Sequence, residues 1–181
     1  MGLSTASYTS TRTVEGKKKG LVIVNTGTGK GKTTAALGTV LRAWGWGWRV
    51  CVIQFIKSEQ GDWGEMRAAR KLGIEWHTMG DGFTWRSRNI ADTIGRVRAA
   101  WELAQQKIVS GEYDLIVLDE MTYALRPECL DAATVVRWMR DNKPAGLHLI
   151  ITGRDAAPEL VEFADLVTEM CKIRHPFDSG V

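Results

Sequence analysis

L-V-I-V-N-T-G-T-G-K-G-K-T-T, residues 21–34, is the segment from which we infer the architecture of this chain. Its first four residues are apolar, as in a strand buried inside a sheet. Glycines at positions 27, 29 and 31 follow, and then a lysine, two threonines and a helix-forming run at residues 35–44. A strand, a glycine-rich loop, a lysine, a hydroxyl and a helix in this order indicate a loop that binds the phosphates of a nucleoside triphosphate.

Each residue type in this loop has a physical role in phosphate binding. Glycines let the backbone approach the phosphates, and the N–H groups of the loop and of the helix N-terminus point toward them. Lys32 supplies a full positive charge, and the Thr33 hydroxyl is suited to bind Mg²⁺. Thr26 stands where the usual signature has glycine. The alternative interpretation is a glycine-rich turn that precedes a helix and binds nothing.

Length and composition are those of an ordinary globular protein. With 181 residues, 44% hydrophobic and 25% charged, we expect one domain at residues 20–181 and a flexible, Ser- and Thr-rich arm at residues 1–19. A net charge of +3 suits an anionic ligand but is too small to indicate nucleic acid. No apolar run has the length of a membrane span, so no membrane partner is expected.

Three widely spaced cysteines form neither a zinc motif nor a disulfide framework, which favours a cytoplasmic location. Two of them, Cys51 and Cys171, are expected to be small buried hydrophobic residues. The three histidines show no metal-ligand spacing and are expected to be structural.

Apolar runs alternate with helix-forming segments along the rest of the chain. The expected strands are residues 21–24, 49–55, 74–79, 113–118, 147–152 and 166–173. The expected helices are residues 33–44, 65–72, 90–110, 131–141 and 158–164. This alternation predicts an α/β protein with the three-layer P-loop NTPase (RecA-like) fold and a mostly parallel sheet of about six strands. Three tryptophans in W-G-W-G-W, residues 44–48, are expected to pack where the first helix turns back toward the sheet.

Polar residues follow the carboxyl ends of the predicted strands, where ligands bind in sheets of this kind. Asp119 and Glu120 end one apolar run, and either carboxylate could complete a Mg²⁺ site with Thr33. A solvated acidic turn is the alternative. Arg154 follows another strand and is a candidate ATP-binding residue. No Ser/His/Asp or Cys/His arrangement is recognisable, so the sequence indicates a phosphate site and a metal site without a protein nucleophile.

A loop after the third predicted strand, residues 80–88, carries two large aromatic side chains, Phe83 and Trp85. Loops at this edge of a sheet often carry binding residues, so both side chains are candidates for contact with a ligand. The alternative, that both rings cap the local core, stays open on sequence alone.

Six runs together resemble the P-loop type of ATP:corrinoid adenosyltransferase, the cob(I)yrinic acid a,c-diamide adenosyltransferase family. They are T-G-T-G-K-G-K-T-T (26–34), V-I-Q-F-I-K (52–57), G-F-T-W (82–85), V-L-D-E-M-T-Y (117–123), I-I-T-G-R (150–154) and F-D-S-G-V (177–181). The resemblance extends from about residue 20 to the end, and G-F-T-W is its most specific part. That family also has threonine at the position of Thr26.

The resemblance implies transfer of the 5′-deoxyadenosyl group of ATP to the Co(I) of a corrinoid, with release of triphosphate, in adenosylcobalamin biosynthesis or salvage. The implied ATP-binding residues are Gly27, Thr28, Gly29, Lys30, Gly31, Lys32, Thr33, Thr34 and Arg154. Lys32 and Mg²⁺, held by Thr33 with Asp119 or Glu120, would neutralise the leaving group. Phe83 and Trp85 would press on the lower face of the corrin. The resemblance also implies a homodimer and an electron donor such as a reduced flavoprotein.

One geometric hypothesis and two differences follow from the resemblance. Because the 5′ carbon of ATP must face cobalt, we expect the nucleotide to lie in the loop in the reverse of the direction found in kinases. Its α-phosphate would then be toward the metal-side end of the loop. Arg86 stands where the family usually has an acidic residue, and relatives commonly continue beyond residue 181. A P-loop ATPase or kinase, and a nucleotide-binding regulatory module without turnover, are the alternative functions.

Overall fold

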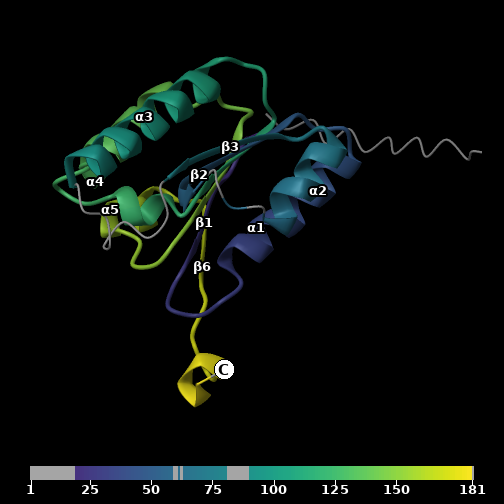
Figure 1. Ribbon diagram of the computed structural model, residues 1–181. Coiled ribbons are helices and arrows are strands. Elements are labelled where there is room, and N and C mark those ends of the chain that lie inside the picture. The colour runs from purple at the N-terminus through teal and green to yellow at the C-terminus, as the bar shows by residue number, and fades with distance from the viewer. Residues whose placement is uncertain (1–18, 59–60, 62, 81–89, 181) are drawn as a thin grey trace, which may run out of the picture.

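The computed structural model describes residues 19–58, 61, 63–80 and 90–180, and these form three layers. A twisted sheet is the middle layer, α1 (Lys32–Gly45) and α2 (Gly64–Leu72) cover one face, and α3 (Ile90–Val109), α4 (Ala132–Asn142) and α5 (Pro158–Phe163) cover the other (Figure 1). Two short 3₁₀ helices, η2 (Met121–Ala124) and η3 (Pro176–Ser179), follow β4 and β6. The predicted helices are confirmed to within one or two residues at their ends.

Six parallel strands make up the sheet in the order β3-β2-β4-β5-β1-β6. They are β1 (Val22–Thr26), β2 (Val50–Ser58), β3 (Glu75–Gly80), β4 (Leu115–Asp119), β5 (His148–Thr152) and β6 (Leu166–Glu169). The four strands β2, β4, β5 and β1 are central and almost entirely buried, because helices cover both of their faces. The predicted three-layer fold with about six strands is therefore confirmed, and every strand pairing is parallel.

Two hydrophobic clusters hold the layers together, one on each face of the sheet. On one face, α3 buries an apolar stripe that includes Val97, Trp101, Ala104 and Ile108. On the other face, α1 buries small side chains such as Ala36 against the sheet. Small side chains there let α1 approach the sheet closely.

Three local expectations are wrong. The sixth strand ends at Glu169 rather than at residue 173, because the chain beyond it turns to pack on the glycine-rich loop. Trp46 is 71% exposed, so it does not take part in the packing expected for W-G-W-G-W. The other two tryptophans do make contacts: Trp44 donates from its Nε1 to a backbone carbonyl of α2, and the Trp48 ring lies 5.0 Å from that of His148. Cys171 is exposed, although Cys51 is buried as predicted.

None of the helices in the described ranges combines the length and the apolar content needed to cross a bilayer. The arm expected at residues 1–19 lies outside the described residues except for Lys19.

Candidate nucleotide site

The glycine-rich loop joins β1 to α1 and leaves the sheet at the same end as the C-terminal segment (Figure 1). Gly27 and Gly31 have φ angles of 94° and 105°, a region that L-residues with a side chain rarely adopt. Lys32 is the first residue of α1, and its Nζ donates hydrogen bonds to the carbonyl oxygens of Gly27, at 2.7 Å, and Gly29. The ammonium therefore lies over the loop, where it can meet phosphate oxygens.

Positive charge is concentrated around this ammonium. Burial lowers the pKa of Lys32, and the neighbouring Arg154 and Lys30 lower it further. Three cations held close together repel one another, and a polyanion bound among them relieves that repulsion. The positive charge around the loop therefore favours the binding of phosphate groups.

The chain's own C-terminal segment also requires two of the loop glycines. Gly29 N donates to Met170 O at 2.6 Å, and Met170 N donates to Thr26 O at 2.9 Å. A Cβ at Gly27 or Gly29 would lie 2.5 or 2.7 Å from the same Met170 oxygen. The sequence explanation by phosphate approach alone was incomplete, because Met170 clamps the loop and no motif marks it.

Thr26, which replaces the usual glycine, has a structural role. Its hydroxyl accepts a hydrogen bond from Ala156 N at 3.1 Å, so it ties the end of β1 to the segment after β5. A threonine fits at this position because it still belongs to β1, and the positive φ angles begin only at Gly27.

Asp119, at the end of β4, is almost fully buried and accepts three hydrogen bonds. The hydroxyls of Thr33 and Thr152 donate to its Oδ1 at 2.9 and 2.7 Å, and the Gln54 amide donates to its Oδ2 at 2.9 Å. The parallel register places Gln54 opposite Asp119, which explains this last contact. The predicted pair of Thr33 and Asp119 is thus brought together.

The chemistry of this pair fits Mg²⁺. A carboxylate and a hydroxyl are hard oxygen ligands of the kind that Mg²⁺ takes in small number, with water and phosphate oxygens completing its shell. Glu120 follows in a left-handed conformation with φ 60°, and its backbone N–H donates to Thr152 Oγ1 at 2.9 Å. Burial, together with the charge of Asp119, raises the pKa of Glu120.

Arg154 is positioned by a residue that the sequence analysis did not single out. Thr122 donates from its hydroxyl to Arg154 O at 2.6 Å. A Cβ at Gly153 would lie 2.0 Å from the same hydroxyl, so only glycine allows this contact. Thr122 lies within V-L-D-E-M-T-Y and Gly153 within I-I-T-G-R, so the two motifs are in contact.

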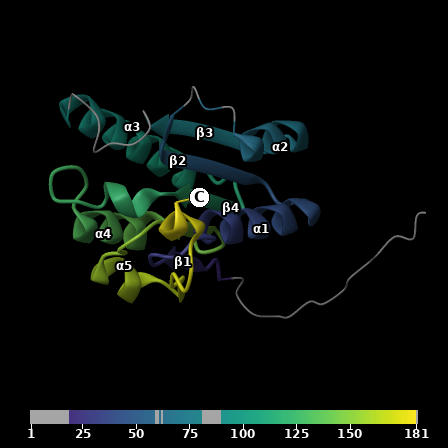
Figure 2. The ribbon, with the colours of Figure 1, turned by 60° about the horizontal axis from the view of Figure 1, so that its bottom comes forward.

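A cavity of about 600 Å³ adjoins the loop. Its lining residues are Thr28, Lys30, Arg154, Lys172, His175 and Asp178. The last three come from the segment after β6, which extends beyond the carboxyl end of the sheet (Figure 1) and lies toward the viewer in the turned view (Figure 2). Sequence reasoning gave this segment no site role beyond its resemblance to a family motif.

Two of the predicted residues, Phe83 and Trp85, lie outside the described residues, as does Arg86. The loop that carries them follows β3, which is the strand at the opposite edge of the sheet from β6.

The fold and the loop define a P-loop nucleotide-binding protein. Residues 18–181 match the family described as ATP:corrinoid adenosyltransferase BtuR/CobO/CobP, and the chain belongs to that family. The resemblance found in the sequence is therefore confirmed.

Named relatives agree with this assignment. The chain is 41% identical over 166 residues to a corrinoid adenosyltransferase of Sinorhizobium sp, covering 91% of this chain and 78% of the relative. It is 39% identical to the corrinoid adenosyltransferase of Escherichia coli (strain K12), covering 91% of this chain and 83% of the relative. The corrinoid adenosyltransferase CobA of Salmonella typhimurium is 38% identical with the same two coverages.

Proposed function

We propose that this protein is an enzyme that transfers the 5′-deoxyadenosyl group of ATP to the Co(I) of a corrinoid, in adenosylcobalamin biosynthesis or salvage. Family membership carries this proposal. The loop geometry supports it, because Lys32 lies over the glycine-rich loop at the N-terminus of α1, with Arg154 and Lys30 close to its ammonium.

In this reaction the cobalt of the corrinoid substrate supplies the electron pair, so the protein needs no nucleophile of its own. A cobalt–carbon bond forms at C5′ of ATP, the C5′–O bond breaks, and its electron pair leaves with triphosphate. Lys32, Lys30 and Arg154 stabilise the negative charge that the triphosphate gains as it departs. The loop fixes the triphosphate so that C5′ is held in line for attack.

We propose Mg²⁺ as the resident metal, held by Thr33 with Asp119 or Glu120. When bound, the ion would neutralise phosphate charge. The hydrogen bonds from Gln54 and Thr152 hold the Asp119 carboxylate in one orientation, which favours ligation by Asp119 over Glu120.

Strand order supports a reversed nucleotide. The loop of residues 81–89 follows β3 at one edge of the sheet, whereas the cavity with Lys30, Arg154 and Lys172 adjoins the segment after β6 at the other edge. A triphosphate suits the cationic side, so the adenosyl group would extend toward Asp119 and the loop after β3. A nucleotide-bound structure with its ribose pointing away from that loop would contradict this orientation.

Phe83 and Trp85 remain the proposed contacts with the corrin. An apolar wall against its lower face would exclude an axial ligand and ease reduction of the cobalt. Replacing both residues with alanine should abolish adenosyl transfer and leave ATP binding intact.

The deciding experiment is anaerobic incubation with ATP, Mg²⁺ and chemically reduced cob(I)alamin. We expect the visible spectrum of a cobalt–carbon bond and one triphosphate released per bond formed. Release of ADP and phosphate from ATP, with the corrinoid unchanged, would instead indicate a P-loop ATPase or kinase. Binding of ATP without any consumption would indicate a regulatory module.

We further propose a homodimer, a reduced flavoprotein as electron donor, a cytoplasmic location, and one domain at residues 20–181 after an arm at residues 1–19. Light scattering tests the dimer, and limited proteolysis tests the boundary near residue 19. Supplying reduced flavoprotein in place of the chemical reductant tests the donor.

A further inference from the structure

The cavity beside the glycine-rich loop, called here the cationic cavity, contains an ion pair whose lysine could exchange its carboxylate partner for a phosphate. Lys172 Nζ donates to both carboxylate oxygens of Asp178, at 2.9 and 3.0 Å. Both side chains line the cavity and are about half exposed, at 45% and 50%. An ion pair with this exposure contributes little to stability, so the lysine can leave its carboxylate at small cost.

The position of Lys172 is fixed relative to the phosphate-binding loop. Met170, two residues earlier, exchanges backbone hydrogen bonds with Gly29 and Thr26. Because this clamp ties the segment after β6 to the loop, Lys172 enters the cavity from a defined direction. Thr28 and Lys30 line the same cavity from the loop.

The charge of the cavity selects its ligand. Lys30, Arg154 and Lys172 carry three positive charges against the single carboxylate of Asp178 among the lining residues. A nucleobase or ribose would gain little from three cations, whereas the end of a triphosphate carries the matching charge.

We propose that Lys172 binds the terminal phosphate of ATP and of the departing triphosphate, and that Asp178 holds the ammonium until the phosphate displaces it. This assignment rests on the proposed function, because it deepens the description of the same site. The Lys172 ammonium exchanges the Asp178 carboxylate for the terminal phosphate within the same cavity, so a side-chain rotation is sufficient and the backbone need not move.

Replacing Lys172 and replacing Asp178 should change triphosphate affinity in opposite directions, whereas a purely structural ion pair would give the same change for both. The probe is inorganic triphosphate, and its Kd is measured by titration calorimetry at fixed salt and Mg²⁺. Lys172→Met should weaken binding about tenfold, because one charged contact is lost. Asp178→Asn should tighten binding a few-fold, because the lysine is released from its competitor. Lys172→Arg should restore most of the affinity lost in Lys172→Met.

Two controls complete the design. Lys71→Met removes an exposed lysine of α2, on a different element, and should leave the Kd unchanged. AMP lacks the β- and γ-phosphates, so its Kd should be the same in wild type and in Lys172→Met.

The outcomes separate this proposal from the proposed function. An unchanged triphosphate Kd in Lys172→Met overturns it, even where the wild type alkylates cob(I)alamin. Weaker binding in both Lys172→Met and Asp178→Asn also overturns it, because that pattern is expected of a pair that only holds the segment in place. Opposite shifts support the phosphate contact even in a protein that fails to alkylate the corrinoid.

Discussion

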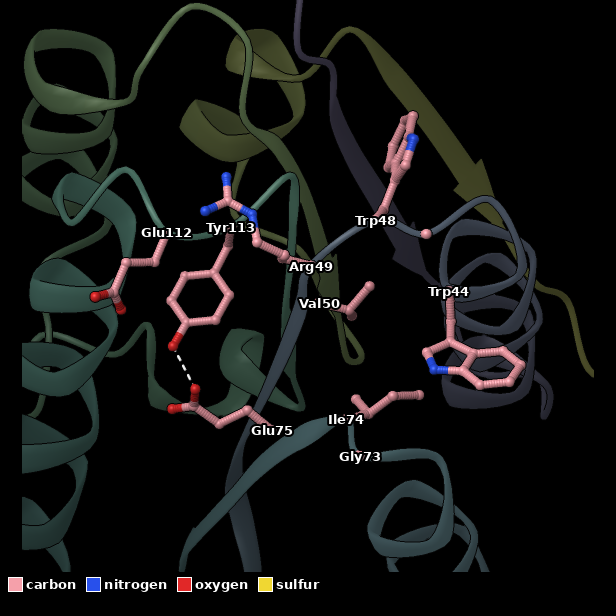
Figure 3. A pocket seen from close by; sticks show the side chains of 10 residues that line it. Trp44, Trp48, Arg49, Val50, Gly73, Ile74, Glu75, Glu112 and Tyr113 are labelled. Carbon is pink, nitrogen blue, oxygen red and sulfur yellow. Dashed lines mark hydrogen bonds between the residues drawn. The ribbon is translucent and has the colours of Figure 1, made fainter. Parts of the chain in front are cut away.

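The two ends of the parallel sheet carry polar residues that are used in different ways. At the amino ends of β2, β3 and β4, a pocket of about 370 Å³ is lined by Trp44, Trp48, Arg49, Glu75 and Tyr113, among others (Figure 3). At the carboxyl ends lies the cationic cavity of about 600 Å³ beside the glycine-rich loop. Both are hollows with charged walls, so size and polarity alone do not tell them apart.

At the amino end, the chain neutralises its own charges. Glu75 accepts hydrogen bonds from Tyr113 and His77, and Lys107 forms an ion pair with it (Figure 3 shows the contact with Tyr113). Arg49 pairs with Asp114 and also donates to a backbone carbonyl. These groups have partners that hold the strands in place. Among the described residues that line the pocket, the charged side chain without an ion pair is an acid, Glu112, so the pocket offers no unmatched cation to an anionic ligand.

At the carboxyl end, the chain leaves positive charge unmatched. Among the residues that the structure describes, the side chains of Lys30 and Arg154 form no ion pair, and Lys32 is bonded only to loop carbonyls. Lys172 does have an acidic partner, Asp178, but both side chains are about half exposed and the pair is easily broken. The contrast teaches that an anion site is marked by cations without carboxylate partners rather than by the volume of a pocket.

The largest difference is therefore expected between replacing a lysine at the carboxyl end of the sheet and replacing one at the amino end, measured as the rate of adenosyl transfer. Lys32→Met should lower the rate of adenosyl transfer at least about 100-fold, since a charge on the leaving triphosphate is no longer stabilised. Lys107→Met should leave that rate within about twofold, because Lys107 pairs with Glu75 far from the loop. Single-turnover formation of the cobalt–carbon bond measures both. Equal losses in the two variants would contradict the division between the ends.

Glycines provide a second contrast, this time in stability. Gly29→Ala should lower the free energy of unfolding by about 2–4 kcal/mol, because its Cβ would lie 2.7 Å from Met170 O and 2.8 Å from Cys171 O. Gly45→Ala, at the exposed end of α1, should change it by less than about 1 kcal/mol, because nothing lies within 4 Å of the added methyl group. Urea denaturation measures both. If Gly29→Ala weakened ATP binding but left the free energy of unfolding unchanged, the backbone at Met170 would have moved to accommodate the methyl group, and the clamp would not contribute to stability.

Sequence motifs predicted the parts of the site that lie next to a strand end. Asp119 ends one strand, Arg154 follows another, and Lys32 and Thr33 come directly after the loop that leaves β1, so the rule that carboxyl ends converge brings them to one edge. Phe83 and Trp85 stay predictions.

The residues that were missed depend on contacts between distant segments. Met170 meets Gly29 only because β6 pairs with β1, and Thr122 meets Arg154 only because β4 pairs with β5. A local pattern cannot show such pairings. Trp46 was misjudged for a related reason: its indole belongs to neither hydrophobic cluster and is 71% exposed, which its residue type does not reveal.

Replacing Glu75 at the amino ends of the strands should give the next largest change in stability, and that change should depend on pH. Burial alone would raise the pKa of Glu75, but hydrogen bonds from Lys107, Tyr113 and His77 outweigh it and lower the pKa to about 2. Stability from this group is therefore complete above the ordinary pKa of 4.5 and is lost as pH falls toward 2. Glu75→Gln should cost about 1 kcal/mol at pH 7, a value reduced for partial solvent exposure.

The pH profile distinguishes an ionic role for Glu75 from simple packing. The difference in unfolding free energy between wild type and Glu75→Gln should shrink as pH is lowered from 5 to 3, measured by urea denaturation at each pH. A difference that stays constant over this range would show that the glutamine disturbs packing and that the carboxylate charge is unimportant. Adenosyl transfer at pH 7 should be unchanged in this variant.

Trp46 should give the smallest effect of the set. Its indole is 71% exposed at the end of α1, next to the amino-end pocket but not among its lining residues. Trp46→Ser should therefore change the free energy of unfolding by less than about 0.5 kcal/mol, as is usual for exposed positions. Its triphosphate Kd should equal that of wild type, because the tryptophan lies at the opposite end of the sheet from the loop. A measurable loss of corrinoid alkylation in this variant would show that the amino end also takes part in the reaction, and the division drawn above would fail.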